Sequence, residues 1–336
     1  MIGSANGNRV SITGLGTAVP ERVLTNDELA AMVDTSDEWI VARTGIHERR
    51  VAEPGEALSD FCFPAAREAL DRAGVRAEDL DLLIVATVTP DMAFPATAAL
   101  VADQLGATKA GAYDLSAGCT GFVYALAQAY AMLAAGVGRR ALVIGADLLS
   151  KVVDWSDRST CVLFGDGAGA VVLERVDRGG FLGFELGADG SGGMELYVAA
   201  GGSRKPASSE TVAAGEHFAR MNGREVFKFA TRVLVSSARE LLDEVGLTVD
   251  DVDVYVPHQA NIRIIDHAAE KLGIPTEKVV VNVDRYGNTS SGSIPLALAD
   301  ARADGRLQDG TLVLLTGMGA GLTWGSALVE WTNGRA

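Results

Sequence analysis

One of the three cysteines lies where a protein can stabilise a thiolate. Cys119 stands in the stretch DLSAGCTGF, between Gly118 and Gly121, with the strand-like KAGAYDL before it and the helix-like FVYALAQAYAMLAAG after it. Free backbone N–H groups and the dipole at a helix N-terminus stabilise negative charge, so this position would lower the pKa of the thiol and make it nucleophilic. The alternative is a small buried hydrophobic residue, which is how most free cysteines behave.

Two further polar residues complete a candidate site. His258 closes an apolar segment in VYVPHQAN, and ligand sites in open α/β folds gather at strand ends. Asn288, in RYGNTSSGSIP, follows a glycine, where asparagine is most often a turn residue. Its place in an internal repeat of the chain favours a functional role. Cysteine hydrolases use cysteine, histidine and asparagine together, so that class of enzyme is one candidate.

The remaining cysteines and histidines have no comparable context. Cys62 and Cys161 lie among apolar neighbours, so we expect both to be buried and inert. We expect His47, His217 and His267 at the surface. The cysteines are scattered and no His/Cys pair has ligand spacing, so the sequence predicts no metal site.

Three glycine-rich runs have different sequence contexts. GLGTAV (14–19) lacks the last glycine and the acidic partner of a dinucleotide-binding fingerprint. GDGAGAVVL (165–173) runs into a strand rather than a helix, which favours tight packing. GMGAGLTWG (317–325) follows an apolar strand, and its small residues would let backbone N–H groups approach a reacting carbonyl.

An internal repeat in the sequence indicates how Cys119, His258 and Asn288 are positioned. AREALDRAGVRAEDLD (66–81) and ARELLDEVGLTVDDVD (238–253) share eight of sixteen positions. In each copy an amphipathic helix ends near a glycine, and an acidic turn leads to an apolar strand, LLIVATV (82–88) or VYVPH (254–258). Gly118-Cys119-Thr120 aligns with Gly287-Asn288-Thr289. If a pseudo-twofold axis relates the halves, Cys119 and Asn288 face each other.

The repeat predicts the fold class. Strands such as LLIVATV show little alternation, which indicates sheets covered by helices on both faces. We therefore expect an α/β protein with a layered α-β-α-β-α architecture and two similar halves, residues 1–180 and 181–336. The glycine- and serine-rich segment 186–222 would form a long surface loop, a candidate cover or entrance.

Composition narrows the class of protein. Of the 336 residues, 48% are hydrophobic and 22% are charged, which is typical of a soluble globular protein. The formal charge of −15 argues against a nucleic-acid partner, and no apolar run approaches the roughly 18 residues that span a bilayer. No secretory signal is recognisable, and the sparse cysteines indicate a reduced, cytoplasmic compartment.

Taken together, the motifs resemble those of a known family. DLSAGCTGF, VPHQANIRI, GNTSSGSIP and GMGAGLTWG, with TSDEWIVARTGIHERR at 35–50, are similar to segments of β-ketoacyl-[acyl carrier protein] synthase III, of the thiolase-like superfamily. The resemblance covers nearly the whole chain. It implies a five-layered thiolase-like fold and the first condensation of fatty acid synthesis, in which an acyl-CoA primer reacts with malonyl-acyl carrier protein.

The resemblance also implies roles for individual residues. Cys119 would take the acyl group, and His258 and Asn288 would bind the malonyl thioester carbonyl. Backbone N–H groups of Cys119 and Ala320 are our candidates for an oxyanion hole. The residues implied to contact coenzyme A are Trp39, Arg43 and Arg158, with Asn261 at the pantetheine arm. Those implied to bind the carrier protein are Gln259, Ala260, Asn261, Ile262 and Arg263. Phe94 is implied to reach the acyl pocket of the partner subunit in a homodimer. No cofactor is implied, because the CoA thioester is a substrate.

Four residues depart from those common in the family. Met318 and Ala320 lie in the glycine run, Arg224 takes a place filled by asparagine in some members, and Glu270 one filled by lysine. These changes bear on carrier docking and on the entrance rather than on the reaction type.

The acidic carrier requires a local basic patch on this acidic protein. We expect Arg263, Lys228 and Lys271 to supply it.

The alternatives to this function are a starter-unit synthase of a polyketide pathway, a cysteine-dependent acyl-thioester hydrolase, and a non-catalytic acyl-CoA binding module. The length and branching of the primer depend on side-chain packing that the sequence does not reveal.

Overall fold

The first half of the chain builds a five-stranded mixed sheet. The computed structural model describes residues 9–332. The strand order is β1-β7-β6-β4-β5, with β1, β7 and β6 antiparallel to one another in turn and with β4 parallel to both β6 and β5. The strands are β1 (Arg9–Ala18), β4 (Leu82–Ala86), β5 (Gly111–Leu115), β6 (Arg140–Leu148) and β7 (Asp166–Val176).

The second half repeats this order in a four-stranded sheet. The order is β8-β13-β12-β11, again with two antiparallel pairings followed by a parallel one. The strands are β8 (Gly180–Ala188), β11 (Val254–Pro257), β12 (Leu312–Gly319) and β13 (Thr323–Glu330). Where the first sheet adds β5, the second has an isolated parallel bridge between Tyr255 and Val279. The predicted internal duplication is therefore confirmed in the topology.

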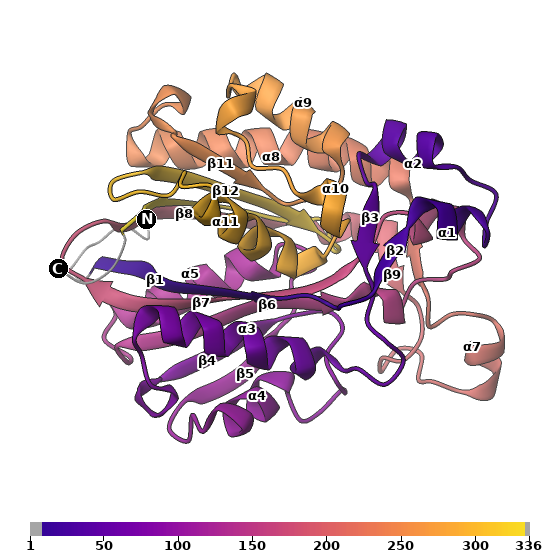
Figure 1. The fold of residues 1–336 in the computed structure, drawn as a ribbon, viewed down its shortest axis with the longest axis horizontal. Coiled ribbons are helices and arrows are strands. Elements are labelled where there is room, and N and C mark those ends of the chain that lie inside the picture. Colours follow the sequence, from indigo (N-terminus) through magenta and orange to yellow (C-terminus); the bar gives the residue numbers. More distant parts are fainter. Residues whose placement is uncertain (1–8, 333–336) are drawn as a thin grey trace.

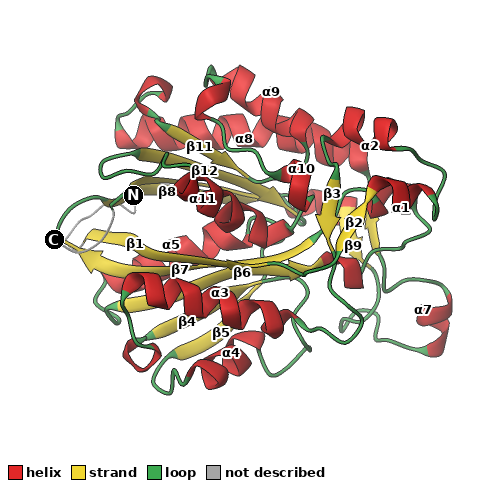
Figure 2. Ribbon diagram, in the orientation of Figure 1, coloured by secondary structure: helices red, strands yellow, loops and turns green. Residues whose placement is uncertain are grey.

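Helices complete the predicted five layers (Figures 1 and 2). The central layer, between the sheets, holds α5 (Gly121–Ala134) and α11 (Ser293–Ala303). The outer face of the first sheet is covered by α3 (Leu58–Ala73) and α4 (Thr97–Leu105), and that of the second by α8 (Gly223–Val245) and α9 (Ile262–Leu272). Three buried apolar clusters match these contacts, one around the central helices and one beneath each outer pair. No described helix is long and apolar enough to cross a bilayer.

The repeated helices end where the sequence predicts. Gly74 after α3 and Gly246 after α8 both adopt left-handed conformations, with φ of 63° and 74°. A glycine at this position accepts the left-handed turn without the steric cost that a Cβ would add. Each turn then leads into the apolar strand, β4 or β11, as the repeat requires.

Shorter elements gather at the end of the sheets where β4, β5 and β11 finish (Figure 1). The segment 186–222 is more ordered than the predicted loop, because β9 pairs with β10 within it. The remaining short elements are β2 (Val23–Thr25), α1 (Asn26–Ala30), α2 (Asp37–Thr44), β3 (Glu48–Arg50), α6 (Arg158–Cys161), β9 (Leu196–Val198), α7 (Ser209–Ala213), β10 (Ala219–Met221) and α10 (Val283–Tyr286).

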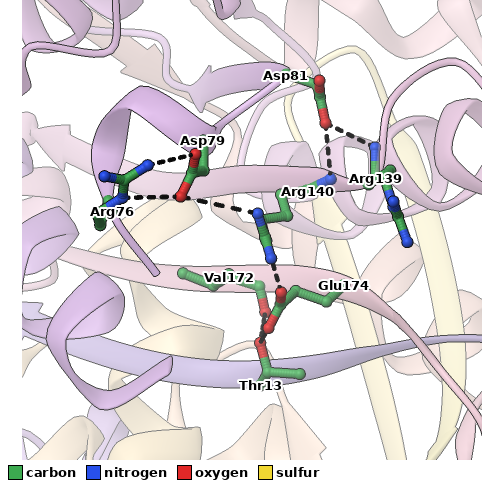
Figure 3. A network of polar contacts seen from close by, with 8 residues as sticks. All are labelled: Thr13, Arg76, Asp79, Asp81, Arg139, Arg140, Val172 and Glu174. Atoms are coloured by element: carbon green, nitrogen blue, oxygen red, sulfur yellow. Dashed lines mark hydrogen bonds and ion pairs between the residues drawn. The ribbon is translucent and has the colours of Figure 1, made fainter. Parts of the chain in front are cut away.

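A polar network fastens the opposite end of the first sheet (Figure 3). Glu174 of β7 accepts a hydrogen bond from Nε of Arg140 at 2.8 Å and one from Oγ1 of Thr13 at 3.0 Å. Asp81 accepts from the backbone N–H of Arg140 at 3.1 Å. These bonds connect β1, β7 and β6 at one end of the sheet. The candidate site lies at the other end.

Candidate active site

Cys119 lies in the turn that joins β5 to α5. Gly118 has a φ of +57°, and a Cβ built on it would lie 2.5 Å from the backbone N of Ala320. A Cβ on Gly319 would lie 2.4 Å from the backbone N of Cys119. The cysteine turn and the β12–β13 hairpin therefore meet backbone to backbone, which only glycine at these two positions permits. The N–H groups of Cys119 and Ala320 are brought close together.

Burial dominates the electrostatics of the Cys119 thiol. The side chain is 8% exposed, and burial raises the pKa of the thiol from its usual 9.0 to about 12, against a smaller lowering by the Ser290 hydroxyl. The predicted position at a helix start is confirmed, since α5 begins at Gly121. Burial acts against the predicted lowering of the thiol pKa, because loss of water destabilises the thiolate.

His258 presents a neutral ring to the site. It follows β11 and is 1% exposed, and burial lowers its pKa from 6.5 to about 3. Its Nδ1 lies 2.6 Å from Oγ of Ser293, which also accepts the backbone N–H of Gln259 at 3.4 Å. The Ser293 hydroxyl satisfies this arrangement by donating its proton to Nδ1, which leaves the ring proton on Nε2. That buried Nε2 has no hydrogen-bond partner within residues 9–332.

Asn288 is held with its amide nitrogen available. Its Oδ1 accepts the backbone N–H of Ser290 at 2.9 Å, so Nδ2 is the end that remains to donate. Its own backbone N–H donates to the carbonyl of Leu163 at 2.9 Å, and its carbonyl accepts from Gly165 at 3.0 Å. The loop before α11 is therefore fixed against the end of the first half.

The three predicted residues share one cavity. Cys119, His258 and Asn288 line a cavity of ≈ 240 Å³, as expected from the alignment of the two halves. The thiol comes from the start of α5, the amide from the loop before α11, and the imidazole from the end of β11. The same cavity is lined farther out by Thr44, Met318, Leu322 and five predicted residues, Trp39, Arg43, Ala260, Asn261 and Arg263.

The aromatic ring at the entrance is covered by two guanidinium groups. The Cζ atoms of Arg43 and Arg158 lie 4.4 Å and 4.9 Å from the ring centroid of Trp39. Arg158 also donates to the backbone carbonyl of Asp34 at 2.6 Å, which anchors it beside α2. A flat ring with two cationic neighbours suits a ligand that combines a heteroaromatic base with phosphate groups.

Segment 259–263 divides into an inner and an outer part. Gln259 is 1% exposed, and its amide bonds inward to the backbones of Pro257, Val280 and Asn282. Ala260 is also buried. These two side chains support the loop rather than reaching a partner protein.

The outer part of the segment begins at the helix cap. Asn261 accepts the N–H of Arg263 at 2.9 Å as the cap of α9 and donates to the carbonyl of Arg43 at 3.0 Å. Ile262 is partly buried, and the exposed Arg263 lies over Phe227 at 5.4 Å.

A second, apolar cavity adjoins the first and also includes Cys119. It measures ≈ 250 Å³ and contains Ser290 as well as the cysteine. Most of its remaining lining is aliphatic or aromatic, from Val88, Leu149, Val152, Val153, Phe164 and Val198. Phe94 lines neither this cavity nor the first and is 85% exposed.

The remaining cysteines and one of the remaining histidines lie as their context suggests, whereas two histidines are less exposed than expected. Cys62 and Cys161 are fully buried, and His47 is exposed. His217 and His267 are partly buried, and the His217 ring packs against Phe218 with 4.1 Å between centroids. Among the described residues, no group of three His, Cys, Asp or Glu side chains could hold a metal ion.

Sequence comparison shows to which protein family the chain belongs. Residues 113–190 match the family model for 3-oxoacyl-[acyl-carrier-protein] synthase III, and residues 242–331 match the model for its C-terminal part. A β-ketoacyl-[acyl-carrier-protein] synthase III of Symbiobacterium thermophilum is 59% identical over 96% of this chain and 98% of its own length. The chain belongs to the synthase III family.

Solved structures of synthase III enzymes share the fold. The Thermus thermophilus enzyme is 52% identical, with a TM-score of 0.89 over 96% of this chain and 99% of its own. The priming β-ketosynthase of the R1128 polyketide pathway is 38% identical, with a TM-score of 0.90 over 97% and 98% of the two chains. The thiolase-like fold that the motifs imply is thereby confirmed.

Gly118 offers a test of the backbone contact in this synthase III site. We expect Gly118→Ala to lower the rate of acyl transfer at least about 100-fold, because the added Cβ would displace the backbone N–H of Ala320, which we predict to be an oxyanion donor. The control is Gly246→Ala, since Gly246 has a φ of +74° but no atom within 4 Å of its Cβ position. It should cost about 1 kcal/mol of stability and leave the rate unchanged. Similar rates for the two variants would show that the close contact is unimportant.

Proposed function

We propose that Cys119 accepts the acyl group of an acyl-CoA primer and that His258 and Asn288 activate malonyl-acyl carrier protein to condense with it. Membership of the synthase III family makes the protein an acyltransferase of fatty acid synthesis. One observation carries the assignment of roles: a thiol and two neutral N–H donors, Nε2 of His258 and Nδ2 of Asn288, line one cavity.

The geometry supports a division of labour in three parts. The Cys119 thiol exchanges with the CoA thioester and holds the acyl chain as a new thioester. His258 and Asn288 then donate to the thioester oxygen of the malonyl group, which stabilises the enolate formed when CO2 leaves. The backbone N–H groups of Cys119 and Ala320 stabilise the tetrahedral oxyanion when that enolate attacks the acyl group.

Hydrogen bonding favours this reaction over hydrolysis. In a papain-like hydrolase an asparagine orients the catalytic histidine. Here Ser293 binds Nδ1 of His258, and the Oδ1 of Asn288 is taken by the N–H of Ser290. The histidine and the asparagine are therefore held separately, each with a donor to give to substrate. The apolar cavity beyond Cys119 protects an acyl-enzyme from water, which also favours condensation.

The entrance fits coenzyme A as a substrate, with no cofactor required. Trp39, Arg43 and Arg158 would hold the adenine and its phosphates. Asn261 has one amide N–H engaged with Arg43 and a second to offer the pantetheine arm. The polyketide alternative would use the same chemistry with another primer, and the size of the apolar cavity does not distinguish it.

The carrier protein would dock at Arg263. Arg263 and Lys228 are exposed beside the entrance, although Lys228 is paired with Glu225 at 2.7 Å. We expect Arg263→Glu to raise the KM for malonyl-carrier protein about tenfold with little change in kcat, an effect that salt would reduce. The control is Arg67→Glu on the opposite face, because Arg67 also lies over a phenylalanine, at 5.8 Å. If both variants raise KM equally, net charge rather than docking at Arg263 is responsible.

A homodimer would account for two exposed features. Phe94 is 85% exposed, and β5 is the edge strand of its sheet. In a dimer the partner's copy of this loop would close the apolar cavity. We expect Phe94→Asp to shift sedimentation of the protein from dimer towards monomer, while Met194→Asp, which replaces another exposed apolar residue, should not. A wild-type protein that sediments as a monomer at micromolar concentration would refute the dimer.

Two further parts of the proposal concern the whole chain. We assign its two ancestral halves to residues 1–180 and 181–336, and we place the enzyme in the cytoplasm without a membrane or nucleic-acid partner.

The test of function is product formation: the protein is mixed with acetyl-, isobutyryl- or longer acyl-CoA and malonyl-carrier protein, and the mass of the carrier is measured by mass spectrometry. A β-ketoacyl-carrier supports the proposal, whereas free acid from acyl-CoA supports the hydrolase.

A further inference from the structure

The reaction of Cys119 raises the question of where its proton goes. The buried thiol must lose a proton as its sulfur attacks the primer, and burial raises its pKa to about 12. His258 is poorly suited to accept it, because Nδ1 is bonded to Ser293 and burial lowers the pKa of the ring to about 3. The proposed function also requires Nε2 of His258 as a donor. Another acceptor close to the thiol is needed.

A buried carboxylate lies beside the loop that follows Asn288. Asp147, near the end of β6, is fully buried. Its Oδ1 accepts from the hydroxyls of Thr87 and Thr89, both at 2.9 Å, and from the N–H groups of Val88 and Thr89 at 2.8 Å and 3.1 Å. Within residues 9–332, its Oδ2 accepts one longer bond, 3.2 Å, from the N–H of Ser291. Oδ2 is therefore the oxygen with capacity for a proton.

Ser290 lies close to both groups: it lines the apolar cavity with Cys119, and the N–H of the next residue, Ser291, bonds Oδ2 of Asp147. Its hydroxyl lowers the pKa of both Cys119 and Asp147, which places it near each group. The hydroxyl is buried and makes no well-aligned hydrogen bond within residues 9–332. Ser290 also holds a φ of +51°, in the left-handed region that favours glycine, and lines the apolar cavity with Cys119. Strained backbone of this kind is characteristic of functional positions.

We propose that Ser290 relays the thiol proton of Cys119 to Oδ2 of Asp147 when the acyl group arrives, and returns it when the acyl group leaves. The inference rests on the proposed function, in that Cys119 is the residue acylated. It adds Ser290 as the group that touches the reacting sulfur and Asp147 as the store for the proton, acting through Ser290.

The protons balance over the two half-reactions. In the first, the Cys119 sulfur bonds to the acyl carbon while its proton passes to Ser290 and the Ser290 proton passes to Asp147. The C–S bond to coenzyme A then breaks, and the CoA thiolate takes a proton from solvent. In the second, the enolate attacks the acyl carbon, the bond to Cys119 breaks, and Asp147 returns the proton through Ser290 to the sulfur. One solvent proton is consumed per turnover, the one that appears on CoA.

The surroundings of Asp147 favour proton storage there. Burial raises the pKa of Asp147, against the hydrogen bonds that it accepts. Cys62, packed on the same side, has its pKa raised by burial and then by Asp91, Asp114 and Asp147. Cys62 thus reports negative charge on this side of the sheet, and burial is what favours a proton on Asp147 itself.

Ser290→Gly is the decisive variant, because glycine accepts the left-handed backbone and removes only the hydroxyl. Acylation of Cys119 is followed in single turnovers with acetyl-CoA from pH 6 to pH 9 by intact-protein mass spectrometry. We expect the variant to acylate about 100-fold more slowly than wild type at pH 7. Its rate should then rise about tenfold per pH unit, because hydroxide must now remove the proton. A rate and pH profile equal to those of wild type would overturn the relay.

Three comparisons keep the result interpretable. Asp147→Asn should show the same altered pH profile, and the double variant should lose no more than either single one, because both interrupt one path. If Asp147→Asn does not fold, Ser290→Gly decides alone. Ser11→Gly removes another buried hydroxyl without a partner, on β1, and should keep the wild-type profile. Failure of the proposed function would appear differently, as absence of acyl label on Cys119 in the wild-type protein.

Discussion

Cys119→Ala protein will take up no acyl group from acyl-CoA at any pH between 6 and 9, and condensation will fall by about 10⁴-fold or more. The reason is that the acyl-enzyme needs a sulfur where the entrance cavity, which we propose to bind CoA, adjoins the apolar cavity. Cys119 lines both. Intact-protein mass spectrometry after incubation with acyl-CoA measures the first effect, and release of β-ketoacyl-carrier measures the second.

The other two cysteines provide matched controls. Cys62 and Cys161 are fully buried, lie outside both cavities, and have their pKa values raised by burial. Cys62→Ala and Cys161→Ala should lose stability, by about 1–2 kcal/mol each, but keep acyl uptake. Acyl label found on either of these cysteines, or on Cys119→Ala protein, would refute the assignment of the nucleophile.

The second large effect concerns the two donors. His258→Ala and Asn288→Ala should each slow malonyl decarboxylation by about 10²–10³-fold, which corresponds to roughly 3–4 kcal/mol of barrier. Acyl uptake by Cys119 should change less than about tenfold, because neither donor is needed to form the acyl-enzyme. Release of labelled CO2 from malonyl-carrier protein measures the first rate, and mass spectrometry of the acyl-enzyme measures the second.

The comparison with acyl uptake is what makes this prediction specific. His267→Ala, on α9 and outside both cavities, serves as the control and should retain both rates. If His258→Ala lost decarboxylation and acyl uptake to the same extent, His258 would be acting on Cys119 rather than on the malonyl carbonyl. The proposed division of labour would then be wrong.

Much of the fold could be predicted because the repeat carries its information locally. Gly74 and Gly246 each mark the end of an amphipathic helix, and the apolar strands after them need helices on both faces. The repeat also placed Cys119 and Asn288 at equivalent positions of the two halves. That symmetry explains why residues 169 positions apart in the sequence share a cavity.

What could not be predicted depends on contacts between distant segments. The burial that raises the Cys119 pKa comes from tertiary packing around the side chain, whereas the local sequence shows only the helix start. Ser293 is five residues beyond Asn288 in the same motif, yet nothing there indicates that it bonds the ring of His258. Asp147 stands in an apolar strand with no motif around it. The β9–β10 pairing within 186–222 likewise joins segments that composition identifies only as loop.

The most direct measurement is a single-turnover experiment on acylated wild-type enzyme. The protein is loaded with labelled acetyl-CoA, freed of unbound substrate, digested and mapped, and a second portion is mixed with malonyl-carrier protein. We predict one label per chain on the peptide containing Cys119, and its transfer to the carrier as a β-ketoacyl group with one CO2 released per label. Label on another residue, or its loss as free acetate when the carrier is added, would refute the proposed role of Cys119.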